Sequence, residues 1–181
     1  MSAATIEAGS GRPPAGAADR RVWDIAATVC DPEIPVLTIA DLGILRDAAL
    51  VPGAEGGDDT ARVTITPTYS GCPAMDAIRE DIVAALTAHG YRHVQVHFSL
   101  SPAWTTDWMS EAGKARLSAY GIAPPTGSAA VSGPIRVALS VKCPRCSSLR
   151  TREITRFGST SCKALYVCGD CQEPFDYFKV L

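Results

Sequence analysis

Apolar and polar positions follow two different periods in the first 120 residues of the chain. Alternation of apolar with polar residues predicts three strands, and spacing of three and four predicts helices. The expected elements are helix 20–29, strand 44–51, strand 61–66, helix 73–89, strand 93–100 and helix 104–120 broken around Gly113. The order α-β-β-α-β-α is typical of an α+β domain, with a small mixed sheet and helices on one face.

Composition suggests where this domain begins and ends. Residues 1–19 are rich in Ala, Gly, Pro and Ser and lack an apolar signal-like run, which predicts a flexible tail, with Asp19 as an N-cap. The α+β domain is expected over 20–122, a Pro- and Gly-rich linker over 123–134 and a small β-rich module over 135–181. No apolar run approaches 18 residues, so a membrane span is not expected.

Four cysteines near the C-terminus form two C-x-x-C pairs, Cys143–Cys146 and Cys168–Cys171. Each pair presents two sulfur atoms on one tight turn, and a hairpin of the 21 intervening residues would bring the pairs together. A module of about 45 residues buries too little apolar surface to fold alone, so bound metal would supply folding free energy. The spacing predicts a structural four-cysteine Zn²⁺ site, with iron in the same cage as the alternative.

The remaining cysteines bear on compartment and ligation. Cys162 lies six residues before the second pair and is expected to be a buried or free thiol, with a place in the ligand set as the alternative. The total of seven is odd, and the N-terminus has no export-type signal. Reduced cysteines in the cytoplasm are therefore expected, rather than disulfides.

A predicted strand, turn and helix meet at Cys72. Val63 and Ile65 alternate with threonines, and Pro73 suits the first turn of the following helix. Cys72 is therefore expected at or beside a helix N-cap, where unpaired backbone N–H groups favour a thiolate. This position predicts a lowered pKa for Cys72 and a reactive or metal-handling sulfur. The alternative is a small buried cysteine that closes a turn.

Other polar residues give weaker signals. Asp31 and Asp41 lie in predicted turns, where they are expected to cap backbone N–H groups, and they are candidates to face Cys72 and support it. The three histidines are spaced by four residues: His89, His93 and His97. Two of them fall in a predicted strand, which favours surface or capping roles over a metal triad. Because no nucleophile–base or acid–base pair is apparent, the sequence predicts a non-catalytic protein.

Charge changes sign along the chain. From residue 135 onward there are eight Lys and Arg against four acidic residues, whereas the earlier part has nine basic and fifteen acidic residues. Four thiolates on a divalent metal return two negative charges, so the module is only mildly basic. With a net charge of −2 and a pI near 5.9, this pattern argues against nucleic-acid binding.

Several motifs resemble known families. SufT-like iron–sulfur assembly factors have an α+β domain that this chain resembles in Asp31-Pro-Glu-Ile-Pro-Val36, Ile39-Ala-Asp-Leu-Gly43, Thr64-Ile-Thr-Pro-Thr68 and Gly71-Cys72-Pro73. The chain also resembles the PaaD family in 157–166, the Cys168–Cys171 pair and 173–179. Members of this family are accessory subunits encoded with bacterial phenylacetyl-CoA epoxidase (phenylacetate-CoA oxygenase). The resemblance spans about Val22 to Lys179, including the segment 101–109.

The resemblance implies an accessory protein that helps to mature the oxygenase or its reductase, without catalysing the oxidation. It marks Cys72 as the signature residue, where iron or an iron–sulfur cluster would be held transiently, with the ribbon serving docking or rigidity. The implied partners are the oxygenase and reductase subunits and the iron–sulfur assembly machinery. Two alternatives stay open: an electron-transfer or catalytic subunit with iron in the four-cysteine site, and a nucleic-acid-binding zinc ribbon.

Overall fold

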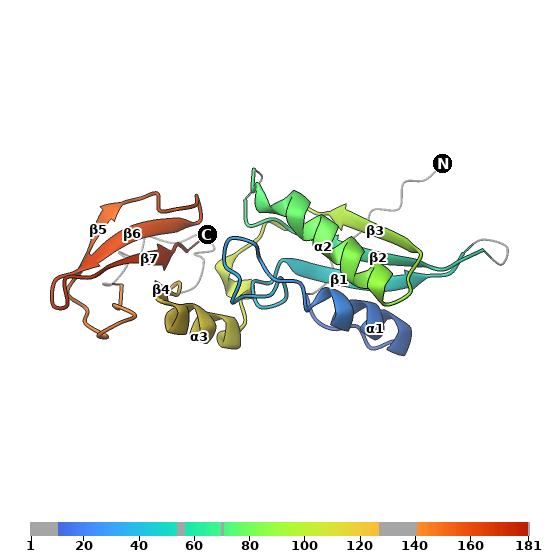
Figure 1. Ribbon diagram of the computed structural model, residues 1–181, viewed down its shortest axis with the longest axis horizontal. Coiled ribbons are helices and arrows are strands. Elements are labelled where there is room, and N and C mark those ends of the chain that lie inside the picture. The colour runs from blue at the N-terminus through green and yellow to red at the C-terminus, as the bar shows by residue number, and fades with distance from the viewer. Residues whose placement is uncertain (1–10, 54–56, 70, 127–140, 181) are drawn as a thin grey trace. The chain divides into compact units, whose positions relative to one another are not determined.

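The computed structural model describes residues 11–53, 57–69, 71–126 and 141–180 (Figure 1). The chain forms two compact units, 1–104 and 105–181. Most of the expected tail, most of the expected linker and residues 135–140 of the expected β-rich module lie outside the described residues. Among the helices of the described ranges, none has the length and apolarity needed to cross a membrane.

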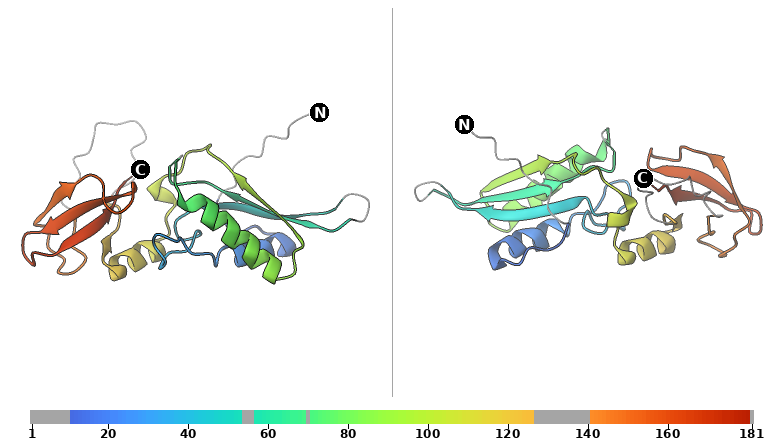
Figure 2. Two further views of the ribbon diagram at one scale, coloured as in Figure 1. Left: turned by 45° about the horizontal axis from the view of Figure 1, so that its top comes forward. Right: turned by 180° about the vertical axis from the view of Figure 1, so that it is seen from behind.

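The first unit contains a three-stranded sheet and two helices. Its elements are α1 (Ala17–Ala26), β1 (Leu45–Val51), β2 (Thr60–Ile65), α2 (Ala74–Ala88) and β3 (His93–Phe98). The sheet order is β1-β2-β3, with β1 antiparallel and β3 parallel to β2. The two helices contact each other and lie on the same face of the sheet (Figure 2). The predicted mixed sheet with helices on one face is confirmed.

The core of this unit follows from the two sequence periods. In β2, alternate residues Ala61, Val63 and Ile65 are fully buried beneath the helices. In α2, the residues one helical turn apart that face the sheet are also fully buried: Ile78, Ile82 and Leu86. Because β2 is the central strand and α2 follows it directly, this core fixes the loop that joins them.

The start of α1 differs from the prediction. Gly16, not Asp19, occupies the N-cap position, and α1 begins at Ala17, inside the stretch expected to be a tail. Asp19 lies in the first helical turn, where its Oδ1 accepts a hydrogen bond from the backbone N–H of Leu50 at 2.7 Å. The side chain therefore ties α1 to β1, an arrangement that local capping rules do not reveal.

The second unit contains a four-stranded sheet and a helix. Its elements are η2 (Thr106–Trp108), α3 (Glu111–Tyr120), β4 (Ile122–Ala123), β5 (Thr151–Thr155), β6 (Lys163–Cys168) and β7 (Pro174–Phe178). The sheet order is β4-β7-β6-β5; β4 runs parallel to β7, and the other neighbours are antiparallel. The predicted β-rich C-terminal module is present, with β4 and β5 as strands that the pattern did not indicate.

Two expectations about residues 104–120 differ from the structure. The helix is interrupted before Ser110 rather than at Gly113, because the Ser110 hydroxyl caps α3 by accepting from the Gly113 N–H at 2.9 Å. Residues 105–122 were also expected to complete the α+β domain. Instead, α3 contacts β4 and β4 pairs with β7, so these residues group with the second unit.

Candidate metal centre and reactive thiol

The two cysteine pairs form turns with the same backbone pattern. The N–H of Ser147 donates to the carbonyl oxygen of Cys143 at 2.9 Å, and the N–H of Gln172 donates to that of Cys168 at 3.1 Å. Both closing residues have left-handed backbone conformations, with φ of 64° at Ser147 and 61° at Gln172. Few non-glycine residues adopt this conformation, so its repetition indicates that both turns are shaped to present sulfur.

These turns bring together the four cysteines that the spacing singled out. Their sulfur atoms all lie within 4.8 Å of one another. The Sγ atoms of Cys143 and Cys171 are 3.8 Å apart, and those of Cys146 and Cys168 are 3.5 Å apart. A tetrahedral centre with metal–sulfur bonds of about 2.3 Å separates its sulfurs by about 3.8 Å. The cluster therefore has the dimensions of a tetrahedral metal–thiolate centre.

Hydrogen bonds from backbone N–H groups lower the pKa of one of these four cysteines. The backbone N–H groups of Cys171 and Asp170 donate to the Cys168 sulfur and lower the pKa of Cys168 to about 6. The Asp170 nitrogen lies 3.4 Å from this sulfur. These hydrogen bonds stabilise the thiolate form of Cys168, which is the form that binds metal.

Cys162 lies apart from this cluster. It immediately precedes β6, whereas Cys168 ends that strand, and six residues of strand span about 20 Å. Its buried Sγ is 3.0 Å from the Thr160 hydroxyl oxygen. The structure thus places Cys162 outside the four-sulfur cluster, as the sequence predicted.

Cys72 lies where the sequence placed it, beside the N-cap of α2. Its N–H donates to the Tyr69 carbonyl at 3.2 Å, its own carbonyl accepts from Met75 at 3.4 Å, and Pro73 is the N-cap. The side chain is half-buried. The loop after β2 and the first turn of α2 therefore hold the thiol in a fixed, accessible position.

The prediction that the pKa of Cys72 is lowered is wrong. Burial raises the pKa of the Cys72 thiol, and the negative charges of Glu33 and Asp31 raise it further. The Ala74 backbone N–H and the Thr68 hydroxyl act in the opposite direction by donating to the sulfur, but they do not compensate. The helix terminus lowers the pKa as anticipated, and the desolvation and acidic neighbours outweigh it.

Asp31 and Asp41 both cap backbone, as predicted. Asp31 Oδ1 accepts hydrogen bonds from the backbone N–H groups of Glu33 at 2.8 Å and Ile34 at 2.9 Å. Asp41 Oδ2 accepts from the Thr38 N–H and hydroxyl at 3.2 and 3.1 Å. Asp31 also acts electrostatically on Cys72, so the turn at 31–34 and the Cys72 loop are neighbours.

Sequence reasoning missed Glu33 and Thr68 as residues that act on Cys72. Glu33 stood out only as part of the Asp-Pro-Glu-Ile-Pro motif, and Thr68 only as part of the strand end. The available signal was their presence in the two motifs that carry the resemblance, which meet in space although they are far apart in sequence.

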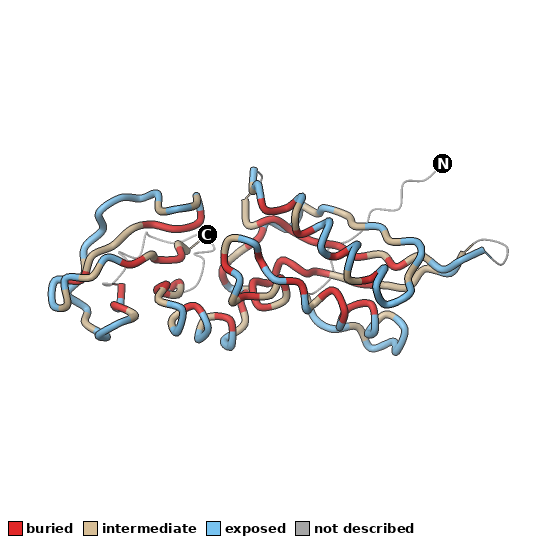
Figure 3. The backbone as a smooth tube through the Cα atoms, in the orientation of Figure 1, coloured by how far each residue is buried: buried red, intermediate tan, exposed pale blue. Residues whose placement is uncertain are grey.

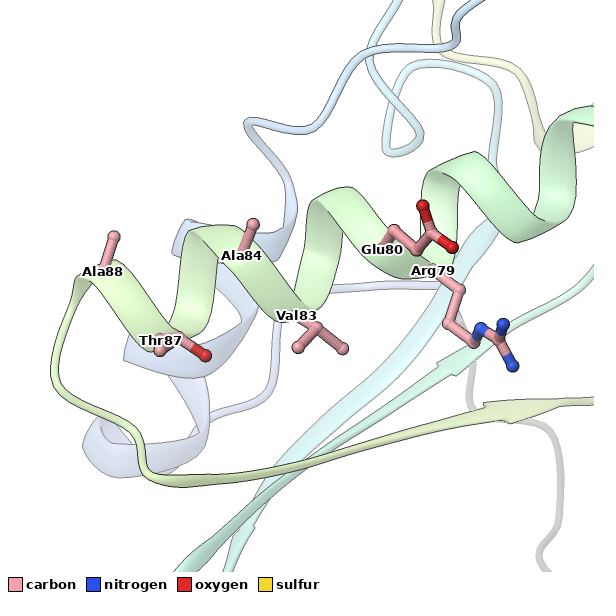
Figure 4. Close-up of a pocket in the computed structure, with 6 residues that line it drawn as sticks. All are labelled: Arg79, Glu80, Val83, Ala84, Thr87 and Ala88. Carbon is pink, nitrogen blue, oxygen red and sulfur yellow. The ribbon is translucent and has the colours of Figure 1, made fainter.

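The histidines and the hollow on α2 contribute little to either site. His89 bonds the Ala85 carbonyl at 2.8 Å, and His93 faces Asp58 at 3.6 Å, so the predicted capping and surface roles are confirmed for these two. A shallow hollow follows the outer side of α2 (Figure 4). Its lining consists of Arg79, Glu80, Val83, Ala84, Thr87 and Ala88. These residues include no thiol.

Two family models match the chain, one for each module. Residues 19–98 match an iron–sulfur cluster assembly protein family, and residues 128–179 match the PaaD zinc beta ribbon domain. Fold, cysteine cluster and matches together indicate a class of two-module protein that joins an α+β iron–sulfur-assembly domain to a metal-binding ribbon.

Similarity to individual proteins narrows this class. The chain is 48% identical over 160 residues to a putative 1,2-phenylacetyl-CoA epoxidase subunit of Escherichia coli (strain K12), covering 88% of this chain and 92% of that protein. The chain therefore belongs to the PaaD family of phenylacetyl-CoA epoxidase subunits.

Shorter relatives match about half of the chain. An Fe-S protein maturation auxiliary factor of Porphyromonas gingivalis is 38% identical over 85 residues, covering 46% of this chain and 75% of that protein. The Fe-S protein maturation auxiliary factor YitW of Bacillus subtilis is 32% identical over 90 residues, covering 49% of this chain and 82% of that protein. A crystal structure of a domain of unknown function, DUF59, from Bacillus anthracis covers 55% of this chain and 90% of its own, with 26% identity and a TM-score of 0.47.

Proposed function

We propose that this chain is a maturation factor for the multicomponent phenylacetyl-CoA epoxidase. It acts in the cytoplasm as a non-catalytic subunit and helps to assemble an iron–sulfur or di-iron centre in an oxygenase or reductase partner. The observation that carries this proposal is the pairing of matches: near full-length similarity to a putative epoxidase subunit, and an assembly-type domain shared with Fe-S maturation factors.

The position of Cys72 supports a role in transient delivery of iron or a cluster. The thiol is half-buried at a fixed point between the β2 loop and α2. Because burial and two carboxylates raise its pKa, the resting sulfur is protonated at neutral pH, and binding of the cargo must displace that proton. This competition weakens retention and favours release to a partner. Asp31 and Asp41 support the site by fixing the turns before β1.

The four-cysteine cluster supports a structural Zn²⁺ site in the ribbon. Four thiolates at tetrahedral spacing complete the coordination shell and leave no open position for substrate. Zinc has no redox chemistry, so the ribbon would contribute folding free energy and a rigid surface. Metal analysis and the visible spectrum of the purified chain distinguish zinc from iron, since zinc–thiolate is colourless at visible wavelengths while iron–thiolate absorbs there.

The test is co-expression of the oxygenase and reductase components with the wild-type chain, without it, or with Cys72→Ser. We expect the iron and labile sulfide of the partners to fall both when the chain is absent and when Cys72 is replaced. Growth on phenylacetate should fail in the same two cases, although the Ser variant folds and keeps its ribbon metal. Full iron content and full growth without the chain would refute the proposal.

Full growth with Cys72→Ser alone would have a narrower meaning. The maturation role would stand, and Cys72 would be reduced to a structural residue of the turn. Serine is a suitable replacement because it is close in size to cysteine and is well tolerated near helix N-termini.

A further inference from the structure

Among the described strands, β5 forms one edge of the ribbon sheet, and its surface combines apolar and cationic side chains. β5 pairs with β6 alone among the described strands, and nearly its whole length is exposed (Figure 3). Two large apolar side chains project there, Ile154 at 48% and Phe157 at 66% exposure. Cations adjoin them: Arg152, Arg156 and Lys179. We name these five residues the β5 surface.

The cations of this surface are poorly neutralised. Arg156 has one ion-pair partner in the described residues, Glu153, at 3.8 Å, and its side chain is 86% exposed. Arg152 and Lys179 form no ion pair within the described ranges. By contrast, the side chain of the neighbouring Arg150 is bound at 2.7 Å to Asp170, which lies in the Cys168–Cys171 turn. The β5 surface therefore carries three positive charges against the single negative charge of Glu153.

Contacts hold the apolar and cationic groups together. The Lys179 ammonium lies 4.9 Å from the centroid of the Phe157 ring and donates to the Arg156 carbonyl at 3.3 Å. This contact joins the end of the chain to the segment that follows β5. A large exposed aromatic ring flanked by ordered cations is a suitable anchor for a partner with an apolar side chain and carboxylates around it.

The geometry of β5 indicates how such a partner binds. The register between β5 and β6 shifts between Glu153 and Thr155, so Ile154 is the extra residue of a bulge. A bulge interrupts the regular spacing of backbone groups that another strand needs for pairing. Recognition therefore depends on the side chains of the β5 surface, not on addition of a fifth strand.

We propose that the β5 surface is the docking site for an acidic segment of an oxygenase or reductase subunit, one that carries an apolar residue for the site beside Phe157. This inference rests on the proposed function for the identity of the partner and on charge complementarity for its chemistry. A protein partner is favoured over nucleic acid, because three cations beside two apolar side chains offer few phosphate contacts.

The test measures binding of the full chain to each purified oxygenase and reductase subunit by calorimetry at low and moderate salt. The test variant is Arg152→Glu with Arg156→Glu. The matched control is Arg79→Glu with Arg92→Glu, the same charge change at exposed arginines of the first unit. We expect the test variant to weaken binding about tenfold or more, and the control to change it little. Phe157→Ser should weaken binding at both salt concentrations, since its contribution is apolar.

Each variant is checked for ribbon metal and for circular dichroism, so that a folding defect is recognised. Any of three results would overturn the docking proposal. The test variant binds as tightly as the wild type, the wild type binds none of the subunits, or the wild type binds single-stranded DNA more tightly than any subunit. Iron loading of the partners reports separately on the proposed function. If iron loading of the partners depends on Cys72 but the test variant binds normally, the maturation role stands and the β5 surface is not the docking site.

Discussion

The carboxylate of Glu33 acts on the thiol of Cys72, although the two residues belong to different motifs. Together with burial, which is the larger cause, it raises the pKa of Cys72. Glu33→Gln should therefore lower this pKa and raise the thiolate fraction at any pH below it. We expect faster alkylation of Cys72 by iodoacetamide at neutral pH, measured by mass spectrometry of the labelled peptide.

Asp58→Asn provides the control for Glu33→Gln. Asp58 faces His93 where β3 begins, whereas Cys72 follows the other end of the neighbouring parallel strand β2. This variant removes the same charge and should leave the alkylation rate of Cys72 unchanged. An equal or slower rate in Glu33→Gln would show that the two groups do not interact.

Cys146→Ser should remove the ribbon metal. The substitution deletes one of four sulfurs within 4.8 Å of one another, and a metal-dependent module of this size loses its main source of folding free energy. Metal content should fall from about one ion per chain to near zero, with loss of ordered structure in β5–β7 while the first unit stays folded. Elemental analysis and amide hydrogen exchange provide the measurements, and retention of the metal would disprove the ligand assignment.

Cys162→Ser should give the opposite result. The Cys162 sulfur lies at the far end of β6 from the cluster and contacts the Thr160 hydroxyl. Metal content should stay at the wild-type value, while burial of a hydroxyl in place of a thiol destabilises the ribbon by about 1 kcal/mol. Loss of the metal in this variant would move Cys162 into the coordination shell.

Trp104→Phe should destabilise the first unit. The indole N–H of Trp104 donates to the Leu42 carbonyl at 2.9 Å, and both residues are buried. Phenylalanine leaves that acceptor unsatisfied, which costs about 1–3 kcal/mol in the free energy of unfolding. Guanidinium unfolding followed by near-ultraviolet circular dichroism measures the change. Trp23→Phe is the control, because Trp23 is also buried but its indole makes no hydrogen bond in the described part of the chain.

The sequence predicted the elements whose burial is periodic and missed those that depend on distant partners. β2 and α2 were found because Val63, Ile65, Ile78 and Ile82 repeat with the period of their element. β4 has two residues and acquires its role from pairing with β7, so no local pattern could indicate it. β5 is nearly all exposed and therefore carries no alternation.

The same distinction applies to the sites. The four clustered cysteines were identified from spacing alone, because a tight turn brings two sulfur atoms together within four residues. The position of Cys72 was also identified, since the strand, turn and proline around it are local signals. Its protonation state was not, because burial and the charges of Glu33 and Asp31 come from the tertiary structure.

The pairing of β4 with β7 determines where the ribbon could be separated from the rest of the chain. Ile122 and Ala123 lie opposite Asp176 and Tyr177, and Ala123 belongs to the same buried cluster as Tyr177. A fragment that starts after the proline-rich stretch would lack the outer strand and leave a core edge open to water. Recombinant expression of the ribbon by itself should therefore begin near Thr105, so that α3 and β4 remain attached.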